Sequence, residues 1–274
     1  LIDKNKGVQF EITPFRTEND YEDKRHPNEI NRSQNLLEDA QRRDFTINAI
    51  YYTCIECNIE GLGDKPKKWI TYNQEDEYMI VTNGIDIHSI IKNWQINIQN
   101  LQKLIRDNCT WKVKHLIIDP YGATNNTDSM KLECVGNAET RLNEDSLRII
   151  RAIRFLVTLQ NSVQIDITKE SRKACQLKFY LVRSLPKERI YTELHKVLRK
   201  NVLFNFVVLV DKLNLLETLF PSLWKCKNIH QPVRYHSFDV YSHTLLCVDA
   251  IKQYNPNPAM QMAVLYHDVG KKDK

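Results

Sequence analysis

The fold of this chain is decided by the stretch NEDSLRIIRAIRF, residues 143–155. Apolar side chains recur through it and just beyond it at helical spacing, at Leu147, Ile150, Ile153 and Leu156. Residues spaced in this way lie on one face of an α-helix, and such a helix packs that face against a core. The stretch therefore predicts a half-buried amphipathic helix at the centre of the fold.

The opposite face of this predicted helix is charged. Asp145, Arg148, Arg151 and Arg154 follow one another at intervals of three residues, which stacks their side chains along one side of the helix. Three arginines in a row repel one another unless an anion lies across them. An anionic ligand along this face is one interpretation. The other is an ordinary surface helix with an Asp145–Arg148 pair and two solvated arginines.

Asp145 and Arg148 together have a specific recognition chemistry. A carboxylate only accepts hydrogen bonds, and a guanidinium group only donates them. An acceptor fixed beside a donor matches cytosine and adenine, which each present an amino group next to a ring nitrogen, and it mismatches guanine and uracil. Under the first interpretation this pair selects cytosine or adenine, and Arg151 and Arg154 extend toward a triphosphate.

Length and composition narrow the class of protein. The 274 residues suffice for about two domains, and the net charge of +5 is compatible with a polyanionic partner. No apolar run in the sequence is long enough to span a bilayer, so we expect no membrane partner. The 7 cysteines are scattered, with a single C-x-x-C at Cys54 and Cys57. This pattern favours reduced thiols in a cytoplasmic protein over a disulfide scaffold.

The N-terminal part predicts a strand, a loop and a helix. Residues 7–15 alternate apolar and polar side chains before a proline, which is typical of a β-strand. Glu11 lies on the polar side of this strand, where a carboxylate can bind a metal ion or face solvent. Residues 16–32 are dense in charge and indicate a loop, and a helix capped by Ser33 follows.

Several ordered motifs resemble one known family. RRDFTINA, residues 42–49, resembles the arginine-arginine-aspartate motif of the tRNA nucleotidyltransferases and bacterial poly(A) polymerases, which include the CCA-adding enzymes. Other segments are similar to the strand and flexible loop before that motif, the end of the catalytic head, the nucleobase-selecting motif and the neck. They are residues 10–16, 21–30, 119–122, 135–137, 144–155 and 186–194.

The resemblance implies a reaction. A tRNA 3′-hydroxyl attacks the α-phosphate of CTP or ATP and releases pyrophosphate, with no nucleic-acid template. Magnesium activates the hydroxyl and stabilises the leaving group. Glu11 matches the family's third carboxylate near this two-magnesium site. The residues that match the family's phosphate-binding position are Arg43, with Arg42 beside it, and Asp44 and Asn48 match positions near the backbone and ribose. Asp145 and Arg148 match the positions that recognise the base, and Arg151 and Arg154 match positions that assist at the base and triphosphate.

The chain departs from the family pattern in two places. The family's metal-binding Asp-x-Asp pair is expected upstream of Gly7, and residues 1–6 do not contain it. Residues 54–117 fill a place where the family has a short turn, and apolar residues from Ile87 to Asp107 recur in them at a helical period. We expect this insertion to be a helical embellishment of the head, and a contact with tRNA or protein is its alternative role.

The C-terminal segment carries a second motif. HSFDVYSHTL, residues 236–245, is followed after a helical span by LYHDVGK, residues 265–271. The pair resembles the opening of an HD phosphohydrolase domain, and the resemblance implies that His243, His267 and Asp268 bind a divalent metal ion. Imidazole and carboxylate ligands together suit a transition metal or magnesium. HD domains place a further aspartate on a later helix, so we expect no phosphodiesterase activity from this segment alone.

These observations predict an α+β fold in three parts. Residues 1–137 form the remainder of a nucleotidyltransferase head with a mixed β-sheet, residues 138–229 form a helical neck and body, and residues 230–274 begin a helical HD domain. Three functions stay open. They are a CCA-adding enzyme that acts on tRNA, a poly(A) polymerase or CC- or A-adding enzyme of the same superfamily, and a non-catalytic nucleotide- or tRNA-binding remnant.

Because Glu11 alone cannot hold a metal ion, we predict that the 274-residue chain by itself transfers no nucleotide. The measurement is incorporation of labelled CTP into a tRNA that lacks its CCA end, with a complete CCA-adding enzyme as the positive control. Incorporation by the isolated chain above the enzyme-free background would refute this prediction.

Overall fold

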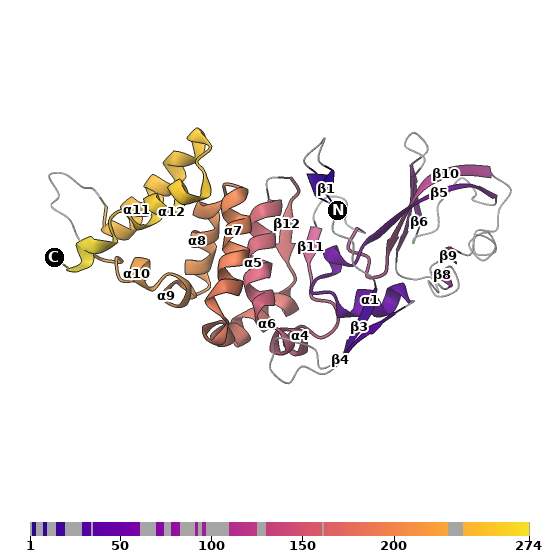
Figure 1. Cartoon of the computed structure of the whole chain (residues 1–274), viewed down its shortest axis with the longest axis horizontal. Helices are drawn as coiled ribbons and strands as arrows, with labels where there is room; N and C mark the ends of the chain where they lie inside the picture. The colour runs from indigo at the N-terminus through magenta and orange to yellow at the C-terminus, as the bar shows by residue number, and fades with distance from the viewer. Residues whose placement is uncertain are drawn as a thin grey trace. The chain divides into compact units, whose positions relative to one another are not determined.

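The computed structural model of the 274-residue chain contains two compact units (Figure 1). The residues that it describes are 2–3, 8–9, 15–19, 29–33, 35–60, 70–73, 78–82, 91–92, 95–96, 110–124, 130–160, 162–229 and 238–273. The first unit comprises Leu1–Thr127 with Glu133–Asn137, and the second comprises Asp128–Leu132 with Ala138–Lys274.

The first unit contains a mixed β-sheet. Its strands follow the order β5-β10-β7-β6, with bounds Tyr51–Glu60, Thr110–Asp119, Tyr78–Thr82 and Ile70–Asn73. β10 is antiparallel to β5 and parallel to β7, and β6 is antiparallel to β7. Antiparallel pairs in the described part of the unit are β1 (Ile2–Asp3) with β2 (Val8–Gln9), β3 (Arg16–Asn19) with β4 (Glu29–Arg32), and β8 (Ile91–Lys92) with β9 (Gln95–Ile96).

The described residues of the insertion lie in β-strands. The prediction of a helix at residues 87–107 is therefore wrong for the residues of this range that the structure describes. β5 and β10 extend into the insertion from its two ends and pair with each other as far as Glu60 and Thr110. Within the expected helix, Ile91 pairs with Ile96 in the β8–β9 hairpin. Short isoleucine-rich segments fit both periods, and β-branched side chains favour the strand.

Helix α1 (Leu36–Arg42) leads into the arginine-arginine-aspartate motif. Its N-cap is Asn35, whose side chain accepts a hydrogen bond from the N–H of Leu37 at 2.9 Å. The expected cap at Ser33 is wrong by two residues, because its Oγ accepts the N–H of Asn35 at 2.8 Å and braces the turn before the helix. Asparagine caps as well as serine does. A short 3-10 turn, η1 (Thr46–Asn48), follows α1.

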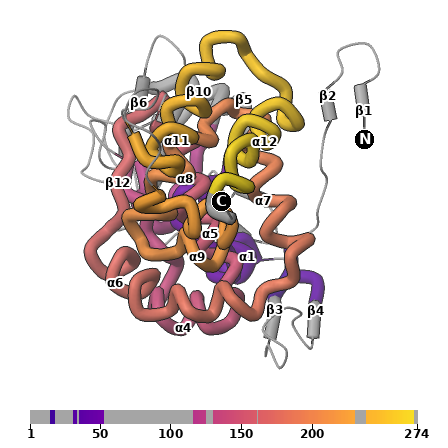
Figure 2. Tube along the Cα trace, turned by 90° about the vertical axis from the view of Figure 1, so that its left-hand side faces the viewer, coloured from indigo at the N-terminus to yellow at the C-terminus, as the bar shows by residue number. Residues whose placement is uncertain are grey.

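The second unit is helical apart from one parallel pair of short strands, β11 (Met130–Leu132) and β12 (Ile165–Ile167). Its described α-helices are α4 (Ala138–Glu144), α5 (Leu147–Leu159), α6 (Lys169–Lys178), α7 (Lys187–Arg199), α8 (Leu203–Lys212), α9 (Leu216–Leu219), α10 (Pro221–Trp224), α11 (Val240–Ala250) and α12 (Pro258–Tyr266). Its 3-10 turns are η2 (Phe179–Ser184), η3 (Ile251–Tyr254) and η4 (Val269–Asp273). Figure 2 shows α11 and α12 beside each other. The predicted α+β fold class is confirmed. No described helix is long and apolar enough to cross a bilayer.

Helix α5 lies at the centre of the second unit, where it contacts α7, α8, η2 and β12 (Figure 1). Leu147, Ile150 and Ile153 of its predicted apolar face are at most 8% exposed. Ile149 and Ala152 beside this face are buried as well. The predicted amphipathic helix is therefore confirmed, and it is buried over a wider arc than the spacing of its apolar residues predicts.

Asparagines follow several helical segments of this unit. Asn201, Asn214, Asn228 and Asn255 have positive φ angles between 46° and 60°. Glycine usually occupies this left-handed conformation after a helix, and asparagine tolerates it better than other side chains do. The chain has only 7 glycines, and asparagine takes their place at these turns.

We predict that Asn214→Ala lowers the free energy of unfolding by about 1 kcal/mol, because alanine pays the steric cost of the left-handed conformation at φ 58°. Asn214 is exposed, and Asn214→Gly is the matched control, expected to change stability by less than about 0.5 kcal/mol. The measurement is urea unfolding followed by circular dichroism. Equal stability of the two variants would contradict the prediction.

Candidate functional site

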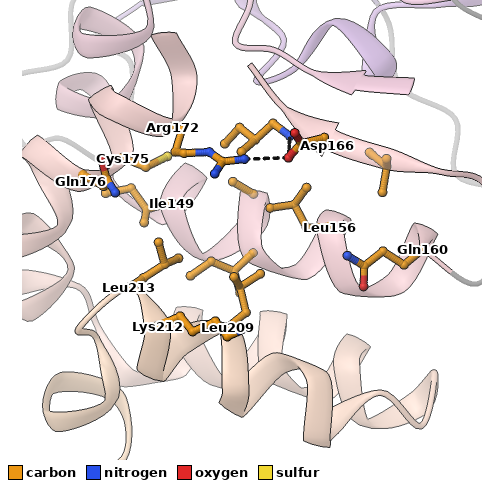
Figure 3. A pocket seen from close by; sticks show the side chains of 14 residues that line it. Ile149, Leu156, Gln160, Asp166, Arg172, Cys175, Gln176, Leu209, Lys212 and Leu213 are labelled. Atoms are coloured by element: carbon orange, nitrogen blue, oxygen red, sulfur yellow. Dashed lines mark hydrogen bonds and ion pairs between the residues drawn. The ribbon is translucent and has the colours of Figure 1, made fainter. Parts of the chain in front are cut away.

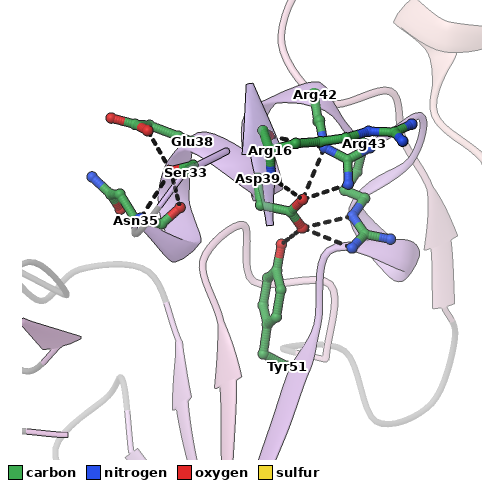
Figure 4. Close-up of polar contacts among 8 residues, drawn as sticks. All are labelled: Arg16, Ser33, Asn35, Glu38, Asp39, Arg42, Arg43 and Tyr51. Carbon is green, nitrogen blue, oxygen red and sulfur yellow. Dashed lines mark hydrogen bonds and ion pairs between the residues drawn. The ribbon is translucent and has the colours of Figure 1, made fainter. Parts of the chain in front are cut away.

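A fully buried carboxylate organises the arginine motif of the first unit (Figure 4). Oδ1 of Asp39, on α1, accepts hydrogen bonds from Arg42 Nε at 2.8 Å and from the backbone N–H of Arg16 at 3.4 Å. Its Oδ2 accepts from Arg43 Nε at 3.0 Å, from Arg43 Nη2 at 2.7 Å and from Tyr51 Oη at 2.9 Å. One carboxylate therefore holds both arginines of the motif in place.

The charges of this group shift the pKa values of Asp39 and Tyr51. Burial by itself raises the pKa of Asp39, but hydrogen bonds from Arg43 and Arg42 outweigh it and hold the pKa below its ordinary value. Burial and the charge of Asp39 raise the pKa of Tyr51, so its hydroxyl stays protonated. The Arg43 side chain is 36% exposed, whereas that of Arg42 is 13% exposed. Arg43 is therefore the arginine of this motif that an anionic ligand can reach most easily.

The next residues of the motif are tied to the backbone of the same unit. Asp44 Oδ1 accepts hydrogen bonds from the N–H of Phe45 at 2.9 Å and from Asn48 Nδ2 at 2.8 Å. The carbonyl of Asp44 accepts the N–H of Val135 at 3.1 Å. The structure thus brings Asp44 and Asn48 together and fixes both immediately after Arg43.

Glu11, predicted as a catalytic carboxylate, lies outside the residues that the structure describes, as do residues 21–28 of the expected flexible loop. Of the strand predicted around Glu11, the described residues Val8 and Gln9 belong to β2 and pair with β1. The role of Glu11 stays a prediction.

Asp145 and Arg148 lie at the start of α5, where the N–H of Arg148 donates to the carbonyl oxygen of Asp145 at 3.1 Å, but their side chains bond other partners. Asp145 Oδ2 accepts a hydrogen bond from Arg189 Nη2 at 2.9 Å. Arg148 Nη1 donates to Glu144 Oε2 at 2.9 Å and to the carbonyl oxygen of Arg141 at 2.5 Å. The interpretation as an intrahelical Asp145–Arg148 pair is therefore wrong, and each group is held by separate partners.

The arginines further along α5 are paired with a carboxylate of the protein itself. Glu193 on α7 is 3% exposed, and it accepts hydrogen bonds from Arg154 Nε at 2.6 Å, from Arg151 Nη1 at 3.5 Å and from Lys196 Nζ at 2.7 Å. The anion expected across the row is thus a carboxylate 39 residues from Arg154. The alternative with two solvated arginines is wrong, since these side chains are 28% and 11% exposed.

The sequence patterns did not single out the carboxylates that anchor these arginines. Asp39 precedes Arg42 and Arg43 by three and four residues, a spacing that places all three side chains together on a helix. Arg189 and Glu193 lie four residues apart on α7 within the segment that resembles the family's neck motif. Helical spacing was thus an available signal for Asp39, whereas the contacts of Arg189 and Glu193 with the α5 region span 44 and 39 residues and depend on packing.

A pocket of about 300 Å³ lies against α5 (Figure 3). Its lining includes aliphatic side chains of α5 and α8, and an ion pair of 2.7 Å joins Arg172 to Asp166 beside it. None of the predicted site residues lines this pocket. It is therefore separate from the candidate site.

A second polar cluster lies where α11 and α12 meet. His243 Nε2 lies 3.7 Å from Asp268 Oδ2, and His267 Nε2 lies 3.3 Å from the same oxygen. The structure thus brings the three predicted metal ligands together. Cys247, one turn after His243 on α11, joins them with its Sγ 3.6 Å from His243 Nε2. The sequence motif did not include Cys247, although its spacing of four from His243 was visible.

The charges in this cluster affect the pKa values of Asp268 and Cys247. Burial by itself raises the pKa of Asp268, but the hydrogen bond from Lys271 Nζ at 2.8 Å and the nearby His267 outweigh it and lower the pKa. Burial and the charge of Asp268 raise the pKa of the Cys247 thiol. The cluster thus contains a carboxylate that stays ionised at neutral pH.

Two family models match the chain. The one described as "Poly A polymerase head domain" matches residues 1–65, and the one described as "Probable RNA and SrmB- binding site of polymerase A" matches residues 164–227. The chain is also 28% identical to a CCA-adding enzyme of Lactococcus lactis subsp. cremoris (strain MG1363), over 72% of this chain and 34% of the relative. In these regions the chain is similar to the family of CCA-adding enzymes and poly(A) polymerases.

The chain spans about a third of the length of the curated relatives that it matches. A CCA-adding enzyme of Geobacillus thermodenitrificans (strain NG80-2) is 28% identical over 71% of this chain and 32% of the relative. Among solved structures, the chain is similar to the Bacillus stearothermophilus CCA-adding enzyme in complex with CTP, with a TM-score of 0.46 and 21% identity over 81% of this chain and 39% of that chain.

We predict that Glu193→Gln lowers the free energy of unfolding by about 3–5 kcal/mol at pH 7, because it leaves a buried guanidinium group without its carboxylate. Burial by itself raises the pKa of Glu193, but Lys196, Arg154 and Arg151 hold it below the ordinary value. The stabilisation is therefore complete above the pKa of the unfolded chain and is lost as the pH falls through the lower pKa of the folded state. The difference between wild type and variant shrinks below about pH 4.

The matched control is Glu188→Gln, an exposed position in the first turn of the same helix, where the expected cost is less than about 1 kcal/mol. Urea unfolding of the three proteins at pH 7 and pH 3 measures both effects. Equal losses for the two variants, or a loss at Glu193 that does not depend on pH, would contradict the prediction.

Proposed function

We propose that this chain is part of a CCA-adding tRNA nucleotidyltransferase, which extends the 3′ end of tRNA with C and A from CTP and ATP without a nucleic-acid template. The observation that carries the proposal is the separate anchoring of Asp145 and Arg148 at the start of α5. The CCA-adding enzymes among the relatives of the chain support the same activity. The proposal concerns the whole protein. This chain spans about a third of the length of the relatives that it matches.

Asp145 and Arg148 keep groups available for a base. A carboxylate has about four positions that accept hydrogen bonds, and at Asp145 the described contacts are those from Arg189 and the N–H of Leu147. Arg148 makes both of its described side-chain bonds through Nη1, which leaves Nε and Nη2 as donors. An acceptor and a donor held in this way match cytosine and adenine and mismatch guanine and uracil. In this proposal the protein edge replaces a template base.

Further nucleotide-binding residues are proposed in each unit. Arg43 binds phosphates, since Asp39 holds it in place and its side chain is partly exposed. Asp44 and Asn48 position the backbone and the ribose. Arg151 and Arg154, anchored by Glu193, assist at the base and triphosphate. A magnesium ion, when bound, supplies activation of the 3′-hydroxyl, and Glu11 is the residue of this chain that we propose near it.

The tRNA partner is supported by the second unit. The family model that matches residues 164–227 is described as a probable RNA-binding site. Exposed basic side chains lie along α6 and α7 in this region. They include Arg172, Lys173, Lys187, Lys196, Arg199 and Lys200. Such side chains neutralise phosphates of a nucleic-acid backbone.

We propose the division of the chain into a nucleotidyltransferase head at residues 1–137, a neck and body at 138–229 and the start of an HD domain at 230–274. In the last part His243, His267 and Asp268 bind a divalent metal ion, which their separations of 3.3 and 3.7 Å support. The scattered cysteines support the cytoplasm as the compartment.

A poly(A) polymerase is the second candidate, because the model that matches residues 1–65 is described as a poly A polymerase head domain. A poly(A) polymerase needs to recognise adenine only. Asp145 and Arg148, which match both cytosine and adenine, are compatible with this. Incorporation of CTP and ATP by the whole protein, on a tRNA that lacks CCA and on a poly(A) primer, separates the two candidates.

We predict that this chain binds CTP and ATP at least about 10-fold more tightly than UTP and GTP, because one bidentate base contact discriminates by about 1–3 kcal/mol. Asp145→Asn is expected to reduce this preference to about 2-fold or less, since an amide can also donate to a carbonyl oxygen. Equilibrium binding of fluorescent analogues of the four nucleotides measures both effects.

The matched control is Asp166→Asn, which changes an exposed aspartate of the same unit that pairs with Arg172. The nucleotide preference of this variant should equal that of the wild type. Circular dichroism checks that each variant is folded. Equal affinity of the wild type for all four nucleotides would sink the proposed role of Asp145 and Arg148.

A further inference from the structure

The cluster between α11 and α12 contains one more metal-binding group than the motif predicts. His243 and Cys247 lie one turn apart on α11, and His267 and Asp268 follow the end of α12. The ligand atoms of His243, Cys247 and His267 all lie within 4.8 Å of one another. The cluster thus offers four side chains from two packed helices.

Three separations in the cluster are close to those of a tetrahedral ion. Zinc bonds of about 2.0–2.1 Å to nitrogen and 2.3 Å to sulfur place neighbouring ligand atoms about 3.3–3.6 Å apart. Cys247 Sγ and His243 Nε2 are 3.6 Å apart, and Asp268 Oδ2 lies 3.7 Å from His243 Nε2 and 3.3 Å from His267 Nε2. The ligand atoms of His243, Cys247 and His267 lie within 4.8 Å of one another, and binding of an ion draws them and Asp268 closer together.

The orientation of His267 also suits a metal ion. Its Nδ1 lies 2.7 Å from the carbonyl oxygen of Val264. A carbonyl oxygen only accepts, so Nδ1 carries the hydrogen and Nε2 of the neutral ring presents its lone pair to the cluster. Metal-binding histidines commonly have their second nitrogen fixed in this way.

Both helices are anchored to the rest of the unit. On α11, Tyr241 Oη donates to Asp211 Oδ2 of α8 at 2.9 Å. On α12, Gln261 Nε2 donates to the carbonyl oxygen of Leu198 of α7 at 2.9 Å. The ligands are thus supported by packed elements, and His243 and His267, at 31% and 36% side-chain exposure, leave a path for an ion.

We propose that Cys247 is a metal ligand together with His243, His267 and Asp268, and that the four bind Zn²⁺ as a structural tetrahedral site that joins α11 to α12. A thiolate favours zinc over magnesium, and four protein ligands leave no open position for a reactive water. Binding releases the thiol proton of Cys247 to solvent and replaces the contact of Lys271 with Asp268. This inference extends the three-ligand set proposed above and is independent of nucleotidyl transfer.

The test is metal binding by the 274-residue chain, reduced and stripped with a chelator, with Co²⁺ as a spectroscopic probe and Zn²⁺ as its competitor. We expect one Co²⁺ per chain, a sulfur-to-cobalt charge-transfer band in the near ultraviolet, and displacement by Zn²⁺ but not by Mg²⁺. Cys247→Ser should abolish the band and weaken Zn²⁺ binding at least 100-fold, since loss of an outer partner alone costs about 10–100-fold. His267→Ala should also lose tight binding.

The matched control is Cys175→Ser, which removes another thiol of the same unit and should leave the band unchanged. X-ray absorption of the zinc-loaded wild type is a second measurement that needs no variant, and it should show one sulfur at about 2.3 Å. Zinc binding without a sulfur ligand, or no stoichiometric zinc, overturns the inference. Nucleotide preference is measured on the same samples, so failure of the zinc site is distinguishable from failure of the proposed function.

Discussion

The second unit depends on the pairing of the arginine row on α5 with one buried carboxylate. Glu193 reaches from α7 to Arg151 and Arg154, and it is 3% exposed. Breaking such a buried pair costs several kcal/mol because the remaining charge cannot return to water. The same contact sets how α5 lies against α7, and the pairing of Arg189 with Asp145 repeats the connection one turn away on α7. Charge pairing thus positions the start of α5, where the proposed base contacts lie.

The first unit uses the same principle on a smaller scale. Asp39 is fully buried and binds the guanidinium groups of both Arg42 and Arg43, so each arginine has a defined direction before any ligand arrives. The Arg43 side chain is partly exposed, and we propose that it binds phosphate. Pre-organised cations lose little conformational freedom when a ligand binds. In both units, therefore, a buried acid orients the basic side chains that we propose for nucleotide binding.

The region of α11 and α12 belongs to the same helical unit. α11 contacts α8, and α12 contacts α7, so the elements that carry the histidines and the cysteine continue the stack that begins at α5. A site built on two packed helices responds to any relative movement of them, because its ligands come from both. The cluster is thus a natural point at which a metal ion stabilises the junction between the helices.

The sequence by itself determined the elements whose physics is local. The apolar spacing in α5 predicted its buried face, the arginine-arginine-aspartate motif and its companions identified the family, and His243, His267 and Asp268 were recognised as one group. The tertiary structure decided what lies far apart in sequence or depends on competing local choices. It paired the arginine row with Glu193, 39 residues beyond Arg154, and it placed Asn35 at the helix cap where Ser33 was expected. It formed a hairpin from Ile91 and Ile96 where a helical period was visible, and it added Cys247 to the histidine cluster. Spacing specifies only neighbours within one turn or one strand, whereas long-range pairing depends on how the elements pack.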